Sequence, residues 1–123
     1  MKTKSEVLNT IHILSQIDIK STNPKTAYWI GRNIRKFEDV SKNFETLREK
    51  IQKDTWFGEY RSKVEADGEE KAKEEYKDLL ASADEEINEY LKEENTIKPY
   101  TIKIDDLDIK PELIPYLVDL ISE

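Results

Sequence analysis

The chain of 123 residues has no cysteine, one histidine, three glycines and four prolines. Without cysteine it has no disulfides, no thiolate metal ligands and no cysteine nucleophile. The single histidine, His12, lacks the partners that the usual metal sites and catalytic triads require, so we interpret it as a residue at the boundary of an apolar face. The scarcity of glycine and proline favours long elements joined by few tight turns.

Long apolar runs are also missing. No 18-residue apolar span occurs and the N-terminus has no run typical of a signal peptide, so we expect a soluble, cytoplasmic or intracellularly assembled protein with no membrane contact. The patterns GxxxxGK[ST], GxGxxG, GxSxG and HExxH are absent as well. We therefore expect no enzymatic activity, no catalytic residues, no cofactor and no bound metal.

Charge is abundant but unevenly distributed. The net charge is −7, yet residues 1–64 hold thirteen Lys or Arg against eight Asp or Glu, while residues 65–123 hold seven against nineteen. Halves of opposite sign can attract each other within one molecule or between copies. The overall acidity argues against a dedicated nucleic-acid binder, whose affinity depends on neutralising phosphates.

The stretch from Asn23 to about Asp54 predicts the longest helix. Asn23 suits a helix cap, and Pro24 suits the first helical position, where its missing N–H costs nothing. Apolar residues then recur at steps of three and four, which is the spacing of one helix face. This stripe consists of Ala27, Ile30, Ile34, Phe37, Val40, Phe44, Leu47 and Ile51.

The remaining elements are expected to pack on this helix. Residues 3–18 predict a short first helix, and residues 69–94 predict a third helix that forms an antiparallel hairpin with the long one. We interpret residues 55–68 as the connection, with a turn at Asp67-Gly68 and aromatic residues sealing the core.

The C-terminal part changes its pattern. Residues 97–104 alternate with a period of two and contain Pro99, which indicates an extended edge segment that lies across the helices or pairs with another chain. A last short helix is expected to begin at Pro111. The predicted fold is therefore all-α: a single helical domain over 1–123, built as a long antiparallel helical hairpin with short N- and C-terminal helices and one extended segment near 97–104.

One basic cluster is the candidate interaction site. It consists of Lys25, Tyr28, Trp29, Arg32, Arg35 and Lys36. Lys25, Arg32 and Lys36 are seven and four residues apart, so they share one side of the predicted helix. Arginines beside aromatic rings can hold phosphates or stack on bases. The alternative, which the acidic remainder of the chain favours, is that this side binds acidic residues of the third helix or of another subunit.

The carboxylates of the third helix have a simpler interpretation. They fall mostly opposite its apolar stripe, and no calcium-binding loop of the form Asp-x-Asp-x-Asp-Gly is present. We therefore expect a solvated acidic face.

Two stretches carry a resemblance to a known family. They are KTAYWIGRNIRKFEDVSKNFETLREKI and the closing LKEENTIKPYTIKIDDLDIKPELIPYLVDLI. With the short helix before them, they resemble a family of small uncharacterised proteins of tailed bacteriophages and prophages, a domain of unknown function. The segment WFGEY within 55–61 departs from that family. The resemblance implies a non-catalytic, phage-encoded protein made in the cytoplasm of a bacterial host, and it assigns no functional residues.

Three hypotheses of function follow. The first is a non-enzymatic protein–protein interaction protein, a virion or assembly-associated or accessory component that acts through helical surfaces and self-association, in the host cytoplasm or in the virion. The second is an acidic inhibitor of a host or defence protein that imitates nucleic acid. The third is a nucleic-acid-binding regulator that uses the basic side of the long helix.

Overall fold

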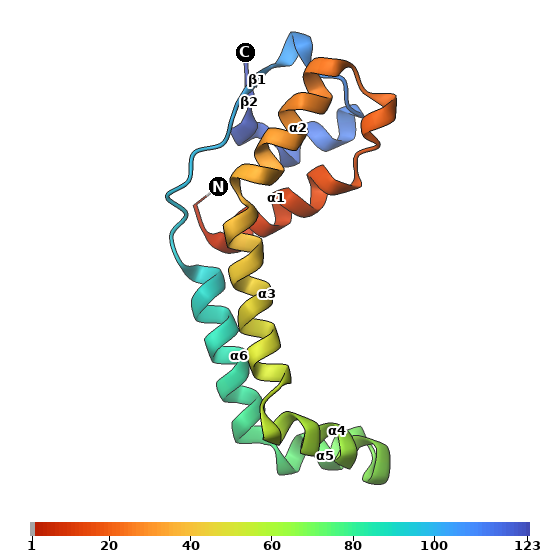
Figure 1. Cartoon of the computed structure of the whole chain (residues 1–123), viewed down its shortest axis with the longest axis vertical. Helices are drawn as coiled ribbons and strands as arrows, with labels where there is room; N and C mark the ends of the chain where they lie inside the picture. Colours follow the sequence, from red (N-terminus) through yellow and green to blue (C-terminus); the bar gives the residue numbers. More distant parts are fainter. Residues whose placement is uncertain (1) are drawn as a thin grey trace. The chain divides into compact units, whose positions relative to one another are not determined.

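A computed structural model describes residues 2–123. Helices dominate it, as the sequence predicts, with one small parallel strand pair, so the all-α fold class is confirmed (Figure 1). The α-helices are α1 (Lys4–Gln16), α2 (Pro24–Lys36), α3 (Glu38–Gln52), α4 (Thr55–Asp67), α5 (Glu69–Glu75) and α6 (Lys77–Lys92). The 3₁₀ turns and strands are η1 (Ile19–Ser21), β1 (Ile102–Lys103), η2 (Ile104–Asp106), η3 (Pro111–Tyr116), η4 (Val118–Leu120) and β2 (Ile121–Ser122).

The chain forms two compact units. The terminal unit comprises the N-terminal stretch through Ser41 together with Glu93–Glu123, and the central unit comprises Lys42–Lys92. The boundary between them falls inside α3. The single domain expected from the sequence stays a prediction. No helix within residues 2–123 combines the length and the apolar character needed to span a bilayer.

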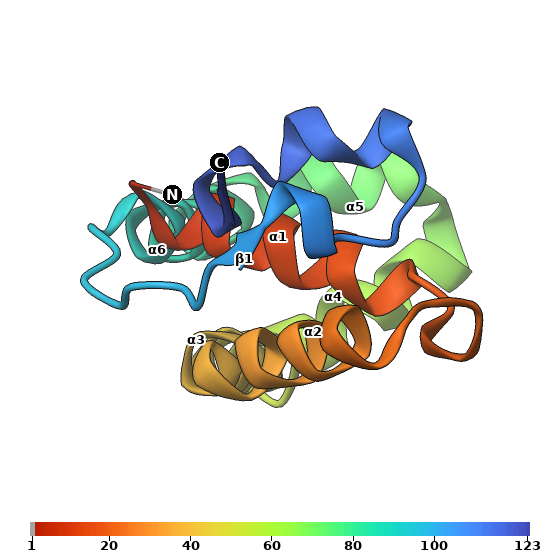
Figure 2. The ribbon, with the colours of Figure 1, turned by 90° about the horizontal axis from the view of Figure 1, so that it is seen from above.

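The terminal unit is built in layers around α1. Figure 2 shows α1 between α2 on one side and the C-terminal 3₁₀ turns on the other. Its core holds side chains from every layer: Leu14, Trp29, Ile30, Ile102, Leu117 and Leu120 are buried together. Burying a Leu, Ile or Val side chain contributes about 1.5–3 kcal/mol. This cluster therefore holds the C-terminal segment against the two helices.

Local signals explain where α1 and α2 begin. The Thr3 hydroxyl accepts a hydrogen bond from Glu6 N at 3.3 Å, and Asn23 Oδ1 accepts one from Thr26 N at 2.8 Å. Both are N-cap bonds that satisfy backbone donors without a partner inside the helix. The two predicted helix starts are thus confirmed.

The predicted helix over 23–54 is wrong as a single element, because the chain leaves helical geometry at Phe37, where φ is −96° and ψ is 5°. Arg35 and Lys36 end α2, whereas Glu38 and Asp39 begin α3. Cations favour the negative end of a helix dipole and anions the positive end, so this order of charges suits one helix ending and another starting. The apolar stripe itself is confirmed, since none of its residues is exposed.

In the central unit, α3 and α6 run antiparallel, as the predicted hairpin requires (Figure 1). The Phe44 and Tyr90 rings stack with centroids 6.1 Å apart, and farther along the pair Ile51 and Ala83 line one hollow. The predicted third helix over 69–94 is interrupted at Tyr76, so the hairpin partner is α6 alone.

The interpretation of residues 55–68 as a connection is wrong, because thirteen of them form α4. Gly68 separates α4 from α5 at a φ of 94°, a conformation that glycine adopts without strain, so the predicted turn is confirmed. The Lys63 ammonium lies 2.9 Å from Asp67 and 3.0 Å from Glu75 and joins α4 to α5. These hydrogen bonds raise the pKa of Lys63 above its ordinary range.

The C-terminal segment also differs from prediction. The extended stretch near 97–104 has a partner in its own chain, because β1 pairs in parallel with β2 and Ile102 lies opposite Ile121. The predicted last short helix does begin at Pro111, but it is a 3₁₀ helix, η3, followed by the 3₁₀ turn η4 and by β2. Pro115 lies inside η3, and its missing N–H removes the bond that an α-helix needs there.

Between α6 and β1 the chain makes one bridge, of Glu94 with Thr3, and otherwise lacks regular structure, and side chains of α2 bind its backbone at Tyr100. Asn33 Oδ1 accepts from Tyr100 N at 2.9 Å, while Asn33 Nδ2 and Trp29 Nε1 donate to Tyr100 O at 3.0 and 2.9 Å. Thr26, near the start of α2, binds the chain beyond β1 in the same way. Its hydroxyl donates to Asp106 O at 3.2 Å and accepts from Asp108 N at 2.9 Å. The Asn33 and Thr26 side chains are wholly buried, and the bonds that they make to this segment are partly buried.

We expect Asn33→Ala to lower the free energy of unfolding by about 2 kcal/mol, because it leaves the partly buried N–H of Tyr100 without an acceptor. The measurement is urea denaturation followed by Trp29 fluorescence in a Trp56→Phe background. Asn43→Ala, at an exposed position of α3, is the matched control and should change stability by less than about 0.5 kcal/mol. Equal losses from both variants would contradict a structural role for Asn33.

Candidate interaction surface

The basic cluster predicted from the sequence forms one surface of α2. Two adjoining hollows cover it, of about 450 and 280 Å3, and both are lined by Arg32 and Tyr100. Lys25, Tyr28 and Trp29 line the first, and Arg35 and Lys36 line the second. We call the basic surface the set Lys25, Tyr28, Arg32, Arg35, Lys36, Tyr100 and Lys103.

Trp29 differs from the other predicted residues. Its side chain is only 4% exposed and belongs to the core, with its indole N–H bonded to Tyr100 O. Tyr28, its neighbour in the sequence, is 63% exposed. Of the two aromatic residues, Tyr28 is therefore the one on the surface, and Trp29 belongs to the core beneath it.

Tyr100 and Lys103 are the members that sequence reasoning missed. They come from the extended segment and its strand, and the hydrogen bonds of Asn33 and Trp29 set Tyr100 on α2. The signal available in the sequence was the polar Asn33, one turn after Trp29 in a helix with an apolar stripe. A buried asparagine needs hydrogen-bond partners, and the backbone of a segment without regular secondary structure can supply them.

The cations of the surface are held by aromatic rings. The Arg32 guanidinium lies 3.7 Å from the Tyr100 ring centroid and 5.3 Å from that of Tyr28, and Lys36 Nζ lies 4.1 Å from Tyr100. Such contacts contribute about 0.5–1 kcal/mol at exposed sites. A guanidinium has five N–H groups, so Arg32 keeps donors for an anion while it contacts these rings.

This arrangement also acts on Tyr100. A hydrogen bond from Arg32, together with the positive charges of Lys36 and Arg32, lowers the pKa of the Tyr100 phenol below its ordinary value of 10.0. Nearby cations favour the anionic form of a titratable group. The same potential would stabilise an anionic group of a ligand placed there.

The ion pairs of the chain leave most of this surface unneutralised. Lys25 lies 3.5 Å from Asp106. Within residues 2–123, no carboxylate lies in ion-pair contact with Arg32, Arg35, Lys36 or Lys103. Four cations thus remain without an acidic partner in a chain that holds 27 Asp and Glu.

The other candidates from the sequence take the positions expected of them. His12 is exposed on α1, with Nε2 3.0 Å from Gln16 Nε2. The carboxylates of α6 are exposed, as the prediction of a solvated face requires; they are Asp78, Asp84, Glu85, Glu86 and Glu89. In the part of the chain that the structure describes, no three His, Asp or Glu side chains converge as metal ligands would.

Comparison with protein-family models, with curated proteins and with solved structures finds no match to this chain.

We expect Arg32→Met to raise the pKa of Tyr100 toward 10.0, because it removes the hydrogen bond and one positive charge from the phenol. The pKa is read from the pH dependence of the tyrosine 13Cζ resonance, which Tyr100→Phe assigns. Arg48→Met, on α3, should leave the transition in place. If Arg32→Met leaves it unchanged as well, Arg32 does not act on Tyr100.

Proposed function

We propose that this chain is a non-enzymatic protein–protein interaction protein whose basic surface binds an acidic segment of its partner. One observation carries the proposal: Arg32, Arg35, Lys36 and Lys103 have no carboxylate partner within residues 2–123, although the chain is strongly acidic. The non-enzymatic part rests on the sequence, where no catalytic motif occurs.

The geometry suits carboxylates on a peptide. Arg32 contacts the Tyr28 and Tyr100 rings, so less side-chain freedom is lost when its N–H groups bind a carboxylate. Arginine binds carboxylates with two parallel hydrogen bonds, and such charge-assisted bonds are stronger than neutral ones. The exposed Tyr28 ring adds apolar contact area, and aromatic and arginine residues are enriched in interface hot spots.

Nucleic acid is the second candidate, and one observation favours it: Arg32 and two tyrosine rings resemble the stacking platforms that hold unpaired bases. The net negative charge of the terminal unit argues against nucleic acid. The terminal unit holds ten Lys or Arg against twelve Asp or Glu, so a long polyanion is repelled beyond the surface itself. A short acidic peptide touches only the cations and avoids that cost.

The biological setting is proposed from the sequence resemblance alone: a tailed phage or prophage encodes the protein, and it acts as an accessory or virion-assembly component in the bacterial cytoplasm or the virion. Self-association belongs to the same proposal. The neighbouring genes test this setting. Capsid or tail genes on either side support an assembly role, and a neighbourhood of bacterial genes alone contradicts it.

We expect Arg35→Glu with Lys36→Glu to weaken binding of a fluorescent glutamate- and aspartate-rich decapeptide by about tenfold or more, because attraction becomes repulsion at two positions. Fluorescence anisotropy at low salt is the measurement. The matched control is Lys71→Glu with Lys77→Glu, which makes the same change in net charge at exposed positions of the central unit.

The same assay with a ten-nucleotide oligothymidylate separates the two candidates. Tighter binding of the oligonucleotide than of the decapeptide would favour nucleic acid and overturn the protein proposal. Loss of decapeptide binding in the control pair would show that net charge, and not this surface, controls binding. A partner captured from phage-infected lysate supports the proposal only if the Arg35/Lys36 pair abolishes the capture and the control pair does not.

A further inference from the structure

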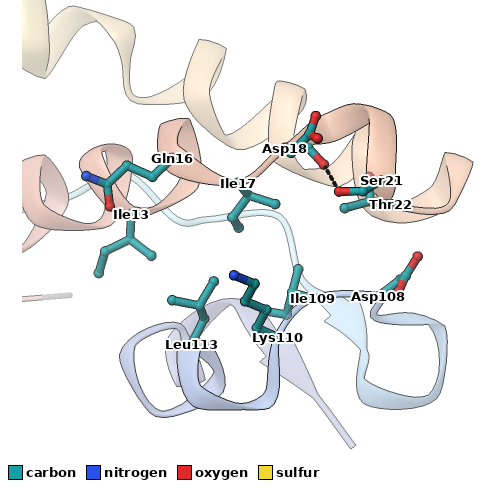
Figure 3. Close-up of a pocket in the computed structure, with 10 residues that line it drawn as sticks. All are labelled: Ile13, Gln16, Ile17, Asp18, Ser21, Thr22, Asp108, Ile109, Lys110 and Leu113. Carbon is teal, nitrogen blue, oxygen red and sulfur yellow. Dashed lines mark hydrogen bonds between the residues drawn. The ribbon is translucent and has the colours of Figure 1, made fainter.

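Another hollow, separate from the basic surface, lies between the end of α1, η1 and residues 108–113 (Figure 3). Its volume is about 670 Å3, within the range of about 300–1,000 Å3 that is typical of ligand pockets. Its lining combines six polar or charged residues with four aliphatic side chains, which are Ile13, Ile17, Ile109 and Leu113. All four are only half-buried, so apolar surface remains open to a ligand.

Lys110 is the one cation among the residues that line this hollow. Figure 3 draws the Lys110 ammonium on the side of Ile17 and Leu113, and the Lys110 residue as a whole is exposed. Within residues 2–123, no carboxylate forms an ion pair with Lys110. An ammonium beside apolar groups gains from an anion more than one in bulk water does.

The acidic groups at the rim are turned elsewhere. The Asp18 and Asp108 carboxylates point away from the ammonium in Figure 3. Asp18 Oδ1 accepts from Lys20 N at 3.1 Å, and Asp108 Oδ2 accepts from Asn23 N at 2.8 Å.

The hydroxyls on that wall are also occupied. Ser21 donates to Asp18 O at 2.9 Å, and Thr22 donates to Ile19 O at 2.8 Å. Lys110 is therefore the one positively charged group that lines the hollow, and no ion pair within residues 2–123 neutralises it.

We propose that this hollow binds the carboxyl-terminal end of an aliphatic peptide from a partner protein. The terminal carboxylate pairs with the Lys110 ammonium, and the last aliphatic side chains pack on the isoleucine and leucine wall. The volume suits several residues of a peptide better than a single small carboxylate. The site shares no lining residue with the basic surface and does not depend on the function proposed for that surface.

The test compares two peptides that differ only at their ends: acetyl-Ala-Leu-Ile-Leu with a free carboxylate, and the same sequence with a carboxamide. Binding is followed by 1H–15N chemical-shift changes of the full chain. We expect shifts centred on Ile17, Ile109 and Leu113, and an affinity about tenfold higher for the carboxylate, because only it pairs with the ammonium.

Lys110→Met should remove that preference, since it keeps the length of the side chain and loses its charge, and Lys110→Arg should retain it. Lys20→Met is the matched control, because Lys20 is exposed near the rim but does not line the hollow, and it should keep the preference. Wild-type helicity in circular dichroism shows that each variant is folded.

Four outcomes would overturn the proposal: no shifts with either peptide at millimolar concentration, equal affinities for carboxylate and carboxamide, equal loss in Lys20→Met, or octanoate binding as tightly as the peptide. The last would assign the hollow to a small aliphatic carboxylate instead. Failure of decapeptide binding at the basic surface leaves this test unaffected, so the two proposals can fail separately.

Discussion

The terminal unit depends on hydrogen bonds from side chains of α2 to the backbone of a segment that forms no regular secondary structure. Tyr100 lies in a stretch without regular structure, yet its N–H and C=O are both bonded, to Asn33 and to Trp29. Burying such groups without partners costs more than a typical hydrogen bond gains. Only with those partners present can the segment lie on the helix and deliver Ile102 to the core and to β2.

Much of this fold follows from patterns that a sequence shows. Helix caps, apolar spacing and the Asp67-Gly68 turn are local properties, and the structure keeps all of them. The interruptions at Phe37 and Tyr76 are different, because the apolar stripe continues through each one and only the backbone departs from helical geometry. The order of charges around Phe37, basic before it and acidic after it, is the one local signal of that break. The apolar periodicity is a stronger signal, and it predicts one continuous helix.

What could not be predicted is non-local. β1 pairs with residues near the end of the chain, and a two-residue strand has too little pattern to identify its partner. Likewise, six basic and aromatic residues on one predicted helix outlined the candidate site, but Tyr100 joins it only through bonds to a buried asparagine. Sequence spacing locates a surface made by one helix, and it cannot locate what another segment adds.

The same dependence links the two proposed sites. Tyr100 and Lys103 border the basic surface, and Asp108 through Leu113 border the aliphatic hollow. Both stretches belong to the segment that α2 holds, through Asn33 at one end and through Asn23 and Thr26 at the other. When buried polar side chains of a helix bind the backbone of another segment, they occupy positions where apolar side chains could pack. Here the hydrogen bonds of Asn33 and Thr26 position the segment that borders both surfaces. This explains why polar residues occupy the buried face of α2.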